Sequence, residues 1–196
     1  LGARERDPYG AGRRTALARH RSLSATLDWT YAMLSDDEQA MLRQLAVFTG
    51  SFTLEAVKTM TASSRLAPRN ALPLLESLMD KSLLIASEST VPKHYRLLET
   101  TRAYALEKLD EQGETRTTCQ RHARYALGVL QEAGRTLDGL SPGTWLALYA
   151  AQINTIRAAL DWAYSPTGDL SLGIELTLGG VPLWLRVSLI SECRSW

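Results

Sequence analysis

The sequence predicts a mainly α-helical protein, in which a winged-helix domain with a small β-hairpin precedes antiparallel helical-repeat hairpins. Three observations support this prediction. Apolar residues recur at helical spacing along most of the chain. Two short β-like runs, residues 82–87 and 94–98, interrupt them. After residue 99, helical segments are separated only by short turns rich in Gly, Pro or Ser, which favours stacked antiparallel helices.

Composition and charge exclude several classes of protein. The 196 residues include 45% hydrophobic and 22% charged residues, which is typical of a folded chain. The 22 Lys and Arg against 21 Asp and Glu leave a net charge of only +1, whereas proteins that coat nucleic acid or anionic membranes carry a larger positive excess. Cys119 and Cys193 are too few for a disulfide framework. The most apolar stretch, residues 172–190, contains Glu175 and Arg186 and is too interrupted to span a membrane. We therefore expect a cytoplasmic protein without membrane contact.

The N-terminal residues 1–21 are expected to form a solvated linker. They hold six Arg and two acidic residues without an apolar period, and a basic arm on DNA is the alternative interpretation. The chain starts without Met and without an apolar signal core, so we expect a fragment of a longer protein.

The winged-helix domain is expected over residues 22–112. A first helix is indicated by one apolar stripe, formed by Leu23, Leu27, Tyr31 and Leu34. The run Ser-Asp-Asp-Glu at residues 35–38 fits a capping box and should start a second helix, which we expect to end at Gly50.

Two more helices and the hairpin complete this domain. Thr53 can cap a third helix over residues 54–61. Pro68 and Pro73 mark the entry to a fourth helix, because Pro is tolerated in a first turn, and Leu74, Leu75, Leu78 and Met79 form its buried side. The turn-like residues 88–93 then join the two β-like runs into a hairpin.

The rest of the chain reads as helices. Residues 99–112 form a helix that Gly113 stops, and residues 113–196 form the start of a truncated helical-repeat array. Its helices are expected over residues 115–137, from a Ser141 cap to residue 164, and from an Asp169 cap to Gly179. Because a terminal repeat normally has a polar outer face, a truncated array should expose an apolar patch at its C-terminal end.

The motifs of catalysis and metal binding are weak. A P-loop needs a Gly before its Lys, and none of the four Lys residues follows a Gly. Cys119 and His122 are three residues apart and can share a helix face, but two ligands do not make a metal site and no third group orients a nucleophile pair. We therefore predict no catalytic residue, no metal and no cofactor in this chain, and hence not an enzyme.

The fourth helix, residues 68–81, is the candidate recognition helix for DNA. It carries Arg69, Asn70 and Lys81 but also Glu76 and Asp80, so its net charge is zero. In the DNA-binding alternative, four residues form a patch that faces the phosphates: Arg65, Arg69, Lys93 and His94. The other interpretation is that these residues lie on a solvated surface.

Four blocks in order resemble the segment that follows the ATPase core in STAND-type (signal-transduction ATPase) bacterial transcriptional regulators. The first block is residues 21–31, which end in Leu-Asp-Trp-Thr-Tyr, and the second is Leu-Ala-Val-Phe-Thr-Gly-Ser-Phe at residues 45–52. The third is Ser-Leu-Met-Asp-Lys-Ser-Leu-Leu at residues 77–84. The fourth is Tyr-Arg-Leu-Leu-Glu-Thr-Thr-Arg-Ala-Tyr-Ala at residues 95–105. Residues 145–147 and 156–162 are similar to the start of the tetratricopeptide-like array of these proteins. Residues 182–185 and 192–194 are similar to the next helices of that array.

The resemblance implies a non-catalytic module that couples a nucleotide-binding core, missing here, to a helical-repeat sensor. ATP or ADP would belong to the preceding ATPase domain, a protein or small-molecule effector to the array, and DNA to another domain of the parent protein. Leu97, Leu98 and Glu99 match by position the Met-His-Asp motif that contacts nucleotide phosphate in this class. An apolar Leu98 cannot hydrogen-bond phosphate, and Glu99 is expected to cap a helix. The alternative function is a winged helix that binds DNA directly.

Overall fold

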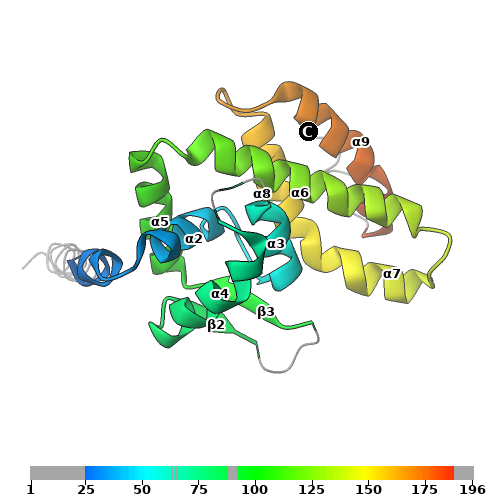
Figure 1. Ribbon diagram of the computed structural model, residues 1–196. Coiled ribbons are helices and arrows are strands. Elements are labelled where there is room, and N and C mark those ends of the chain that lie inside the picture. The colour runs from blue at the N-terminus through cyan, green and yellow to red at the C-terminus, as the bar shows by residue number, and fades with distance from the viewer. Residues whose placement is uncertain (1–24, 63, 65, 88–91, 188–196) are drawn as a thin grey trace, which may run out of the picture.

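The computed structural model describes residues 25–62, 64, 66–87 and 92–187 (Figure 1). Residues 25–32 are helical. The elements that follow are α2 (Asp36–Leu45), β1 (Phe52–Thr53), α3 (Leu54–Thr61), η1 (Pro68–Asn70), α4 (Ala71–Asp80), β2 (Leu84–Ala86), β3 (His94–Leu97), α5 (Glu99–Glu111), α6 (Thr115–Arg135), α7 (Pro142–Tyr149), η2 (Ala150–Gln152), α8 (Ile153–Ala163) and α9 (Leu170–Arg186). The fold is therefore mainly helical, as predicted: a winged helix-turn-helix unit followed by helical hairpins. The predicted linker 1–21 lies outside the described residues, and the division at residues 112 and 113 stays a prediction.

The capping box at the start of α2 is confirmed, but the predicted end of this helix is wrong. Ser35 Oγ accepts from the Glu38 amide at 3.3 Å, and Glu38 Oε2 accepts from the Ser35 amide at 2.7 Å. The helix ends at Leu45 rather than at Gly50. The chain turns after Leu45, and Phe48 stacks on Phe52 with 4.7 Å between ring centroids. Core packing of Phe48 thus overrides the helical apolar pattern.

The sheet has one strand more than the predicted hairpin. Its strand order is β1-β3-β2, and both pairings are antiparallel. Phe52 of β1 pairs with Tyr95 of β3, and Leu84 of β2 pairs with Leu97 of β3. A strand of two residues is too short to show alternation in a sequence, and β1 is created by its tertiary partner.

Corrections in the C-terminal half concern helix ends. The single helix expected from the Ser141 cap to residue 164 is broken into α7, η2 and α8. Asp169 caps α9, since its Oδ1 accepts from the Leu172 amide at 3.2 Å. This helix continues past Gly179 and through Pro182. The expectation of a new array helix at residues 182–185 is therefore wrong, because neighbouring helices hold this segment in α9. Residues 192–194 lie outside the described residues.

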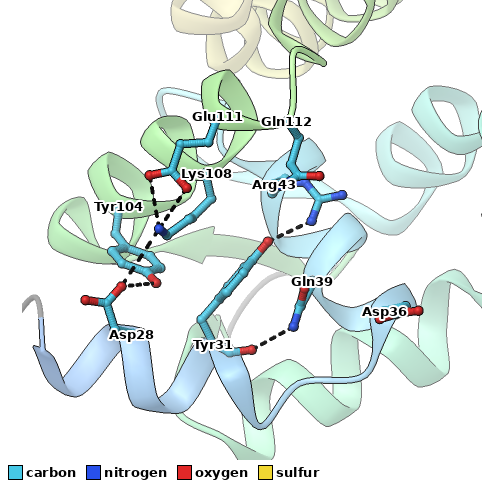
Figure 2. Close-up of a pocket in the computed structure, with 9 residues that line it drawn as sticks. All are labelled: Asp28, Tyr31, Asp36, Gln39, Arg43, Tyr104, Lys108, Glu111 and Gln112. Atoms are coloured by element: carbon cyan, nitrogen blue, oxygen red, sulfur yellow. Dashed lines mark hydrogen bonds and ion pairs between the residues drawn. The ribbon is translucent and has the colours of Figure 1, made fainter.

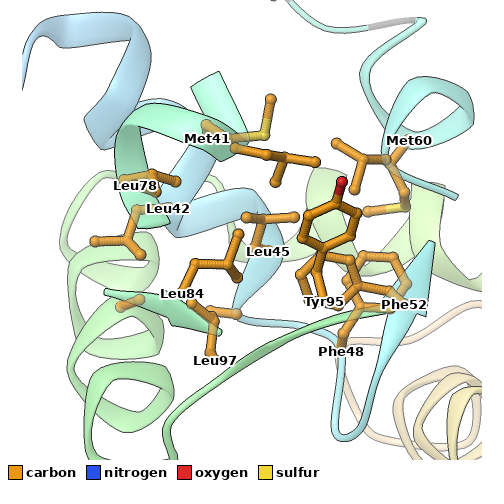
Figure 3. Packing of buried hydrophobic residues seen from close by; sticks show 14 of the residues in the cluster. Met41, Leu42, Leu45, Phe48, Phe52, Met60, Leu78, Leu84, Tyr95 and Leu97 are labelled. Carbon is orange, nitrogen blue, oxygen red and sulfur yellow. The ribbon is translucent and has the colours of Figure 1, made fainter. Parts of the chain in front are cut away.

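Buried side chains form two hydrophobic cores that share α6. The first core is formed by the helices α2, α3, α4 and α5 together with the sheet. Figure 3 shows its centre, where Met41 and Leu45 of α2 face Tyr95 and Phe52 of the sheet. The second core lies between α6, α8 and α9 and contains two fully buried tryptophans, Trp145 and Trp184. On α6 itself, Cys119 and Tyr125 pack against the first core.

The α6 face toward the second core consists largely of small residues. Ala123, Ala126 and Ala133 are buried there, which lets α8 and α9 lie close to the α6 backbone. Trp145 fills the end of this core, and its indole Nε1 donates to the Ala133 carbonyl at 2.8 Å.

His122 lies where the two halves meet. Its ring is 2% exposed and packs edge-on against Phe48, with 5.0 Å between ring centroids. Nearby, the Thr49 hydroxyl donates to the Asn154 carbonyl of α8 at 3.1 Å. These contacts tie the segment after α2 to both α6 and α8.

Across the described stretches 25–62, 64, 66–87 and 92–187, no helix combines the length and the apolar character that crossing a bilayer requires.

We predict that Ser82→Gly stabilises the protein. Ser82 follows α4 with a φ of 58°, a left-handed conformation that is strained for any residue with a Cβ. Its amide donates to the Met79 carbonyl at 2.8 Å and the Leu83 amide donates to the Leu78 carbonyl at 3.0 Å, so the turn is required. Glycine should raise the free energy of unfolding by about 0.5–1 kcal/mol in urea titrations. An unchanged or lower value would contradict this account of the turn.

Burial of His122 should make stability fall in acid. Burial lowers the pKa of His122 from 6.5 to about 4. As the pH falls, the unfolded chain therefore binds a proton on this imidazole at a higher pH than the folded chain does. The contribution of the neutral ring is complete above pH 6.5 and is lost as the pH falls toward 4, by about 3 kcal/mol in total. His122→Phe should remove this part of the pH dependence, measured as the difference between urea unfolding at pH 7 and pH 4.5. Equal losses in both proteins would show that the ring is accessible to protons.

Candidate functional site

The exposed face of α4 is apolar and acidic. In a winged helix-turn-helix this helix holds the recognition position, where base edges and phosphates require Arg, Lys, Asn or Gln. Here Leu72, Pro73, Glu76 and Asp80 are the exposed residues of α4, and Ala71, Leu75 and Leu78 are buried. Glu76 and Asp80 oppose the approach of a phosphate backbone.

A buried carboxylate engages the basic residue at the end of α4. Lys81 Nζ lies 2.5 Å from Glu38 Oε1, and the Ser77 hydroxyl also donates to Glu38. Burial works against ionisation of Glu38, but the donors Lys81, Ser77 and the Ser35 amide hold the pKa of Glu38 at about 2. Lys81 therefore joins α4 to α2, and its charge is already neutralised.

The predicted DNA-facing residues are distributed over η1 and the wing. Arg65 lies outside the described residues. Arg69 is exposed in η1, Lys93 is exposed beside the wing strand β3 and His94 is half-buried in it. Lys93 Nζ lies 5.8 Å from the centroid of the Tyr95 ring. The sequence reasoning missed Arg96, which is exposed on β3; the alternation of buried Tyr95 and Leu97 was the signal that could have found it.

The junction between β3 and α5 holds the three residues matched to the nucleotide-contacting motif. Leu97 is buried, whereas the apolar Leu98 is 41% exposed. Glu99 begins α5, and Arg102 Nη2 lies 2.9 Å from its Oε1. The hydrogen bond from Arg102 lowers the pKa of Glu99. Glu99 thus holds a negative charge in the first turn of α5 and is occupied by Arg102. The role of this motif stays a prediction.

A polar cleft of about 450 Å³ lies between the first helix, α2 and α5 (Figure 2). On one side Tyr104 donates to Asp28 at 2.7 Å, and burial together with this bond raises the pKa of Tyr104. Lys108 lies 2.8 Å from Glu111 and 3.9 Å from Asp28. These side chains pair with one another across the cleft, so the cleft holds the first helix on the domain.

The floor of this cleft contains a buried arginine. The Arg43 guanidinium donates to both carboxylate oxygens of Glu114, at 3.0 and 3.2 Å, and to the Tyr31 hydroxyl at 2.7 Å. Its side chain is only 5% exposed. Gly113, with a φ of +66°, makes the turn that directs Glu114 back toward α2. One side chain therefore connects the first helix, α2 and the start of α6.

Two helices each expose a group of large apolar side chains. On the first helix, Trp29 is 67% and Met33 is 63% exposed, and their spacing of four residues places them on one face. On α9, an exposed stripe consists of Leu170, Ile174, Leu178 and Leu185. This stripe agrees with the apolar patch expected toward the C-terminal end. Exposed apolar faces of this kind mark surfaces that contact other protein segments.

Cys119 and His122 do not form a reactive pair. Burial raises the pKa of the Cys119 thiol to about 11 and lowers the pKa of His122 to about 4. Both groups are therefore neutral near pH 7, without a thiolate for attack or a cation to stabilise it. Across the described residues, no cluster of three or more His, Cys, Asp or Glu side chains is placed to hold a metal ion.

The fold and comparisons define a winged helix-turn-helix domain. Residues 34–110 match the family model described as the winged helix-turn-helix domain, and this range runs from the residue before the α2 capping box to the last turn of α5. No solved structure matches the chain significantly.

The chain is homologous to larger mycobacterial proteins. It is 35% identical over 185 residues to the protein named "Putative HTH-type transcriptional regulator Rv0890c" of Mycobacterium tuberculosis (strain ATCC 25618 / H37Rv), and equally to the Mycobacterium bovis protein Mb0914c with the same description. The match covers 94% of this chain but 21% of each relative, so the chain spans about a fifth of their length. The uncharacterized protein Rv0894 of M. tuberculosis is 34% identical over 111 residues, covering 56% of this chain and 28% of Rv0894.

We predict that Glu114→Gln destabilises the protein by about 3 kcal/mol, because it leaves the buried Arg43 charge without a carboxylate. Urea unfolding at pH 7 measures the loss. Glu111→Gln is the matched control: it removes an exposed partner of Lys108 and should change stability by at most about 0.5 kcal/mol. Similar effects of the two substitutions would contradict the central role given to the Arg43 contact.

Proposed function

We propose that this chain is a non-catalytic regulatory module of a larger transcriptional regulator. Its winged helix-turn-helix domain docks on a neighbouring protein domain and relays the state of that domain to the helical hairpins. The observation that carries the proposal is the exposed face of α4, where Leu72, Glu76 and Asp80 stand in place of the donors that DNA requires. The homology to larger proteins named as HTH-type transcriptional regulators supports the regulatory context.

The docking surface in this proposal is the outer face of the first helix. Trp29 and Met33 are exposed there, while Leu27 and Tyr31 pack inward on the first core. Tryptophan is enriched among the residues that dominate protein interfaces, because it buries a large apolar area at a small entropic cost. A domain that precedes this helix in the parent chain would cover both side chains.

The connection to the hairpins supports a relay. Arg43 joins the first helix and α2 to Glu114 at the start of α6, and Phe48 packs against His122 in the middle of α6. Movement of the first helix therefore acts on α6 through packed and ion-paired groups instead of through a free linker. Such a relay transmits a signal only if the packing differs between two states of the neighbouring domain.

The neighbouring domain in this proposal is a STAND-type ATPase, as the sequence resemblance implies. ATP or ADP would bind to that domain, and an effector would bind to the hairpins as the start of a tetratricopeptide-like array. Direct contact of this chain with nucleotide phosphate is not part of the proposal, because Leu98 is apolar and Glu99 is paired with Arg102. DNA would be bound through another domain.

We predict that the double substitution Trp29→Ser and Met33→Ser in the full-length parent protein accelerates ADP release at least about threefold, since loss of apolar contact area weakens docking. Release is measured by stopped-flow displacement of a fluorescent ADP analogue. Leu178→Ser on α9 is the matched control, because it also removes an exposed apolar side chain. A parent protein that binds no nucleotide, or equal rates in both variants, would overturn the coupling proposal.

Direct DNA binding is the second candidate function. The winged helix-turn-helix match and the exposed Arg69, Lys93 and Arg96 favour it. Fluorescence anisotropy of this chain with labelled duplex between 50 and 200 mM salt separates the candidates. If the domain docks on protein, the Kd of this chain for the DNA duplex is expected to exceed about 10⁻⁴ M. Micromolar binding with a steep salt dependence that Arg69→Ala or Arg96→Ala weakens would establish the DNA-binding function instead.

A further inference from the structure

A groove of about 400 Å³ lies where the two halves of the chain meet. It is lined by Thr59 of α3, by Tyr125, Gly128 and Val129 of α6, and by Leu148 and Tyr149 of α7. The volume is within the range of about 300–1,000 Å³ that small-molecule sites occupy. None of the candidate sites described above includes this groove.

The middle of the groove is open and apolar. A Cβ added to Gly128 would meet no atom within 4 Å apart from the adjoining backbone of α6 itself, so the missing side chain leaves space above this helix. Leu148, which also lines the groove, is 53% exposed. An apolar ligand here would cover surface that water now contacts, which is the driving force for binding.

One end of the groove carries an uncompensated positive charge. Among the residues that the structure describes, Arg124 has no hydrogen-bond or ion-pair partner, and Arg121 lines the adjoining cavity together with Arg124 and Tyr125. The carboxylate at the other end, Glu132, is paired with Arg135 at 2.5 Å. The charge of the groove therefore favours an anion near Arg124.

We infer that this groove binds a small apolar carboxylic acid. The carboxylate pairs with Arg124, whose guanidinium fork fits two carboxylate oxygens. The apolar body of the acid lies over Gly128, between Val129 and Leu148. Such a ligand touches α3, α6 and α7 together, so its binding would favour one arrangement of the two halves. This inference goes beyond the proposed function, because the groove can bind a ligand whichever partner the winged helix-turn-helix domain has.

The test compares two probes of the same shape, naphthalene-2-carboxylate and the uncharged 2-naphthalenemethanol, by isothermal titration calorimetry with this chain at pH 7. The carboxylate should bind about tenfold tighter than the alcohol, owing to its charge-assisted hydrogen bonds. Arg124→Gln should abolish this preference while the affinity for the alcohol stays within about twofold. Gly128→Leu should weaken both probes at least about tenfold, because its side chain fills the groove.

Gly134→Leu is the matched control for Gly128→Leu. Gly134 also lies inside α6 with no atom within 4 Å of an added Cβ, but it does not line the groove. It should leave both affinities unchanged, and circular dichroism verifies that both variants fold. Absence of binding, equal affinities for the two probes, or full binding by Gly128→Leu would overturn the inference. Loss of binding through Ile174→Ser alone would place the probes on the α9 stripe and would also overturn it.

Discussion

The packing of α6 against two different cores is the constraint on which the rest of the structure depends. Cys119 and Tyr125 on one side of this helix pack on the winged helix-turn-helix core, while Ala126 and Leu130 on another side belong to the core of the hairpins. A helix shared in this way cannot rotate or shift without disturbing both cores, because protein interiors are close-packed. The two halves of the chain are therefore mechanically connected by side-chain packing, with the buried His122 at their contact.

Two buried ion pairs fix the position of α2 in the structure, whereas the exposed surface is largely apolar or acidic at several places. Arg43 and Glu38 are both buried, and each is neutralised by a partner from another part of the chain: Glu114 for Arg43, and Lys81 for Glu38. A buried charge that lost its partner would be costly, so these pairs hold α2 in one position relative to α4 and α6. The exposed surfaces are of a different kind, with apolar residues on the first helix and on α9 and carboxylates on α4. This distribution is typical of a module that contacts other protein segments.

Local signals in the sequence predicted much of the fold. The Ser35 capping box, the Thr53 cap and the Gly113 stop depend on residues within one turn, so their short-range hydrogen bonds can be recognised from the residue types alone. Three features that depend on distant partners were missed or misplaced: the strand β1, the end of α2 at Leu45, and the continuation of α9 through Pro182. Of the candidate site, the sequence indicated Arg69 and Lys93 but not the groove at Gly128, because the fold brings α3 against the much later elements α6, α7 and η2 to line it.

The sequence by itself determined the helical character of the chain, the position of the wing and the absence of a P-loop, since these follow from apolar spacing, turn residues and motif composition. Only the tertiary structure decided that α6 serves two cores, that Arg43 reaches Glu114 across 71 positions, and that Trp29 and Met33 stay exposed. The physical reason is that periodicity shows which face of a helix is apolar, whereas the partner of that face is set by long-range packing. Contacts of this kind arise from the joint fit of many side chains, which no local run of residues encodes.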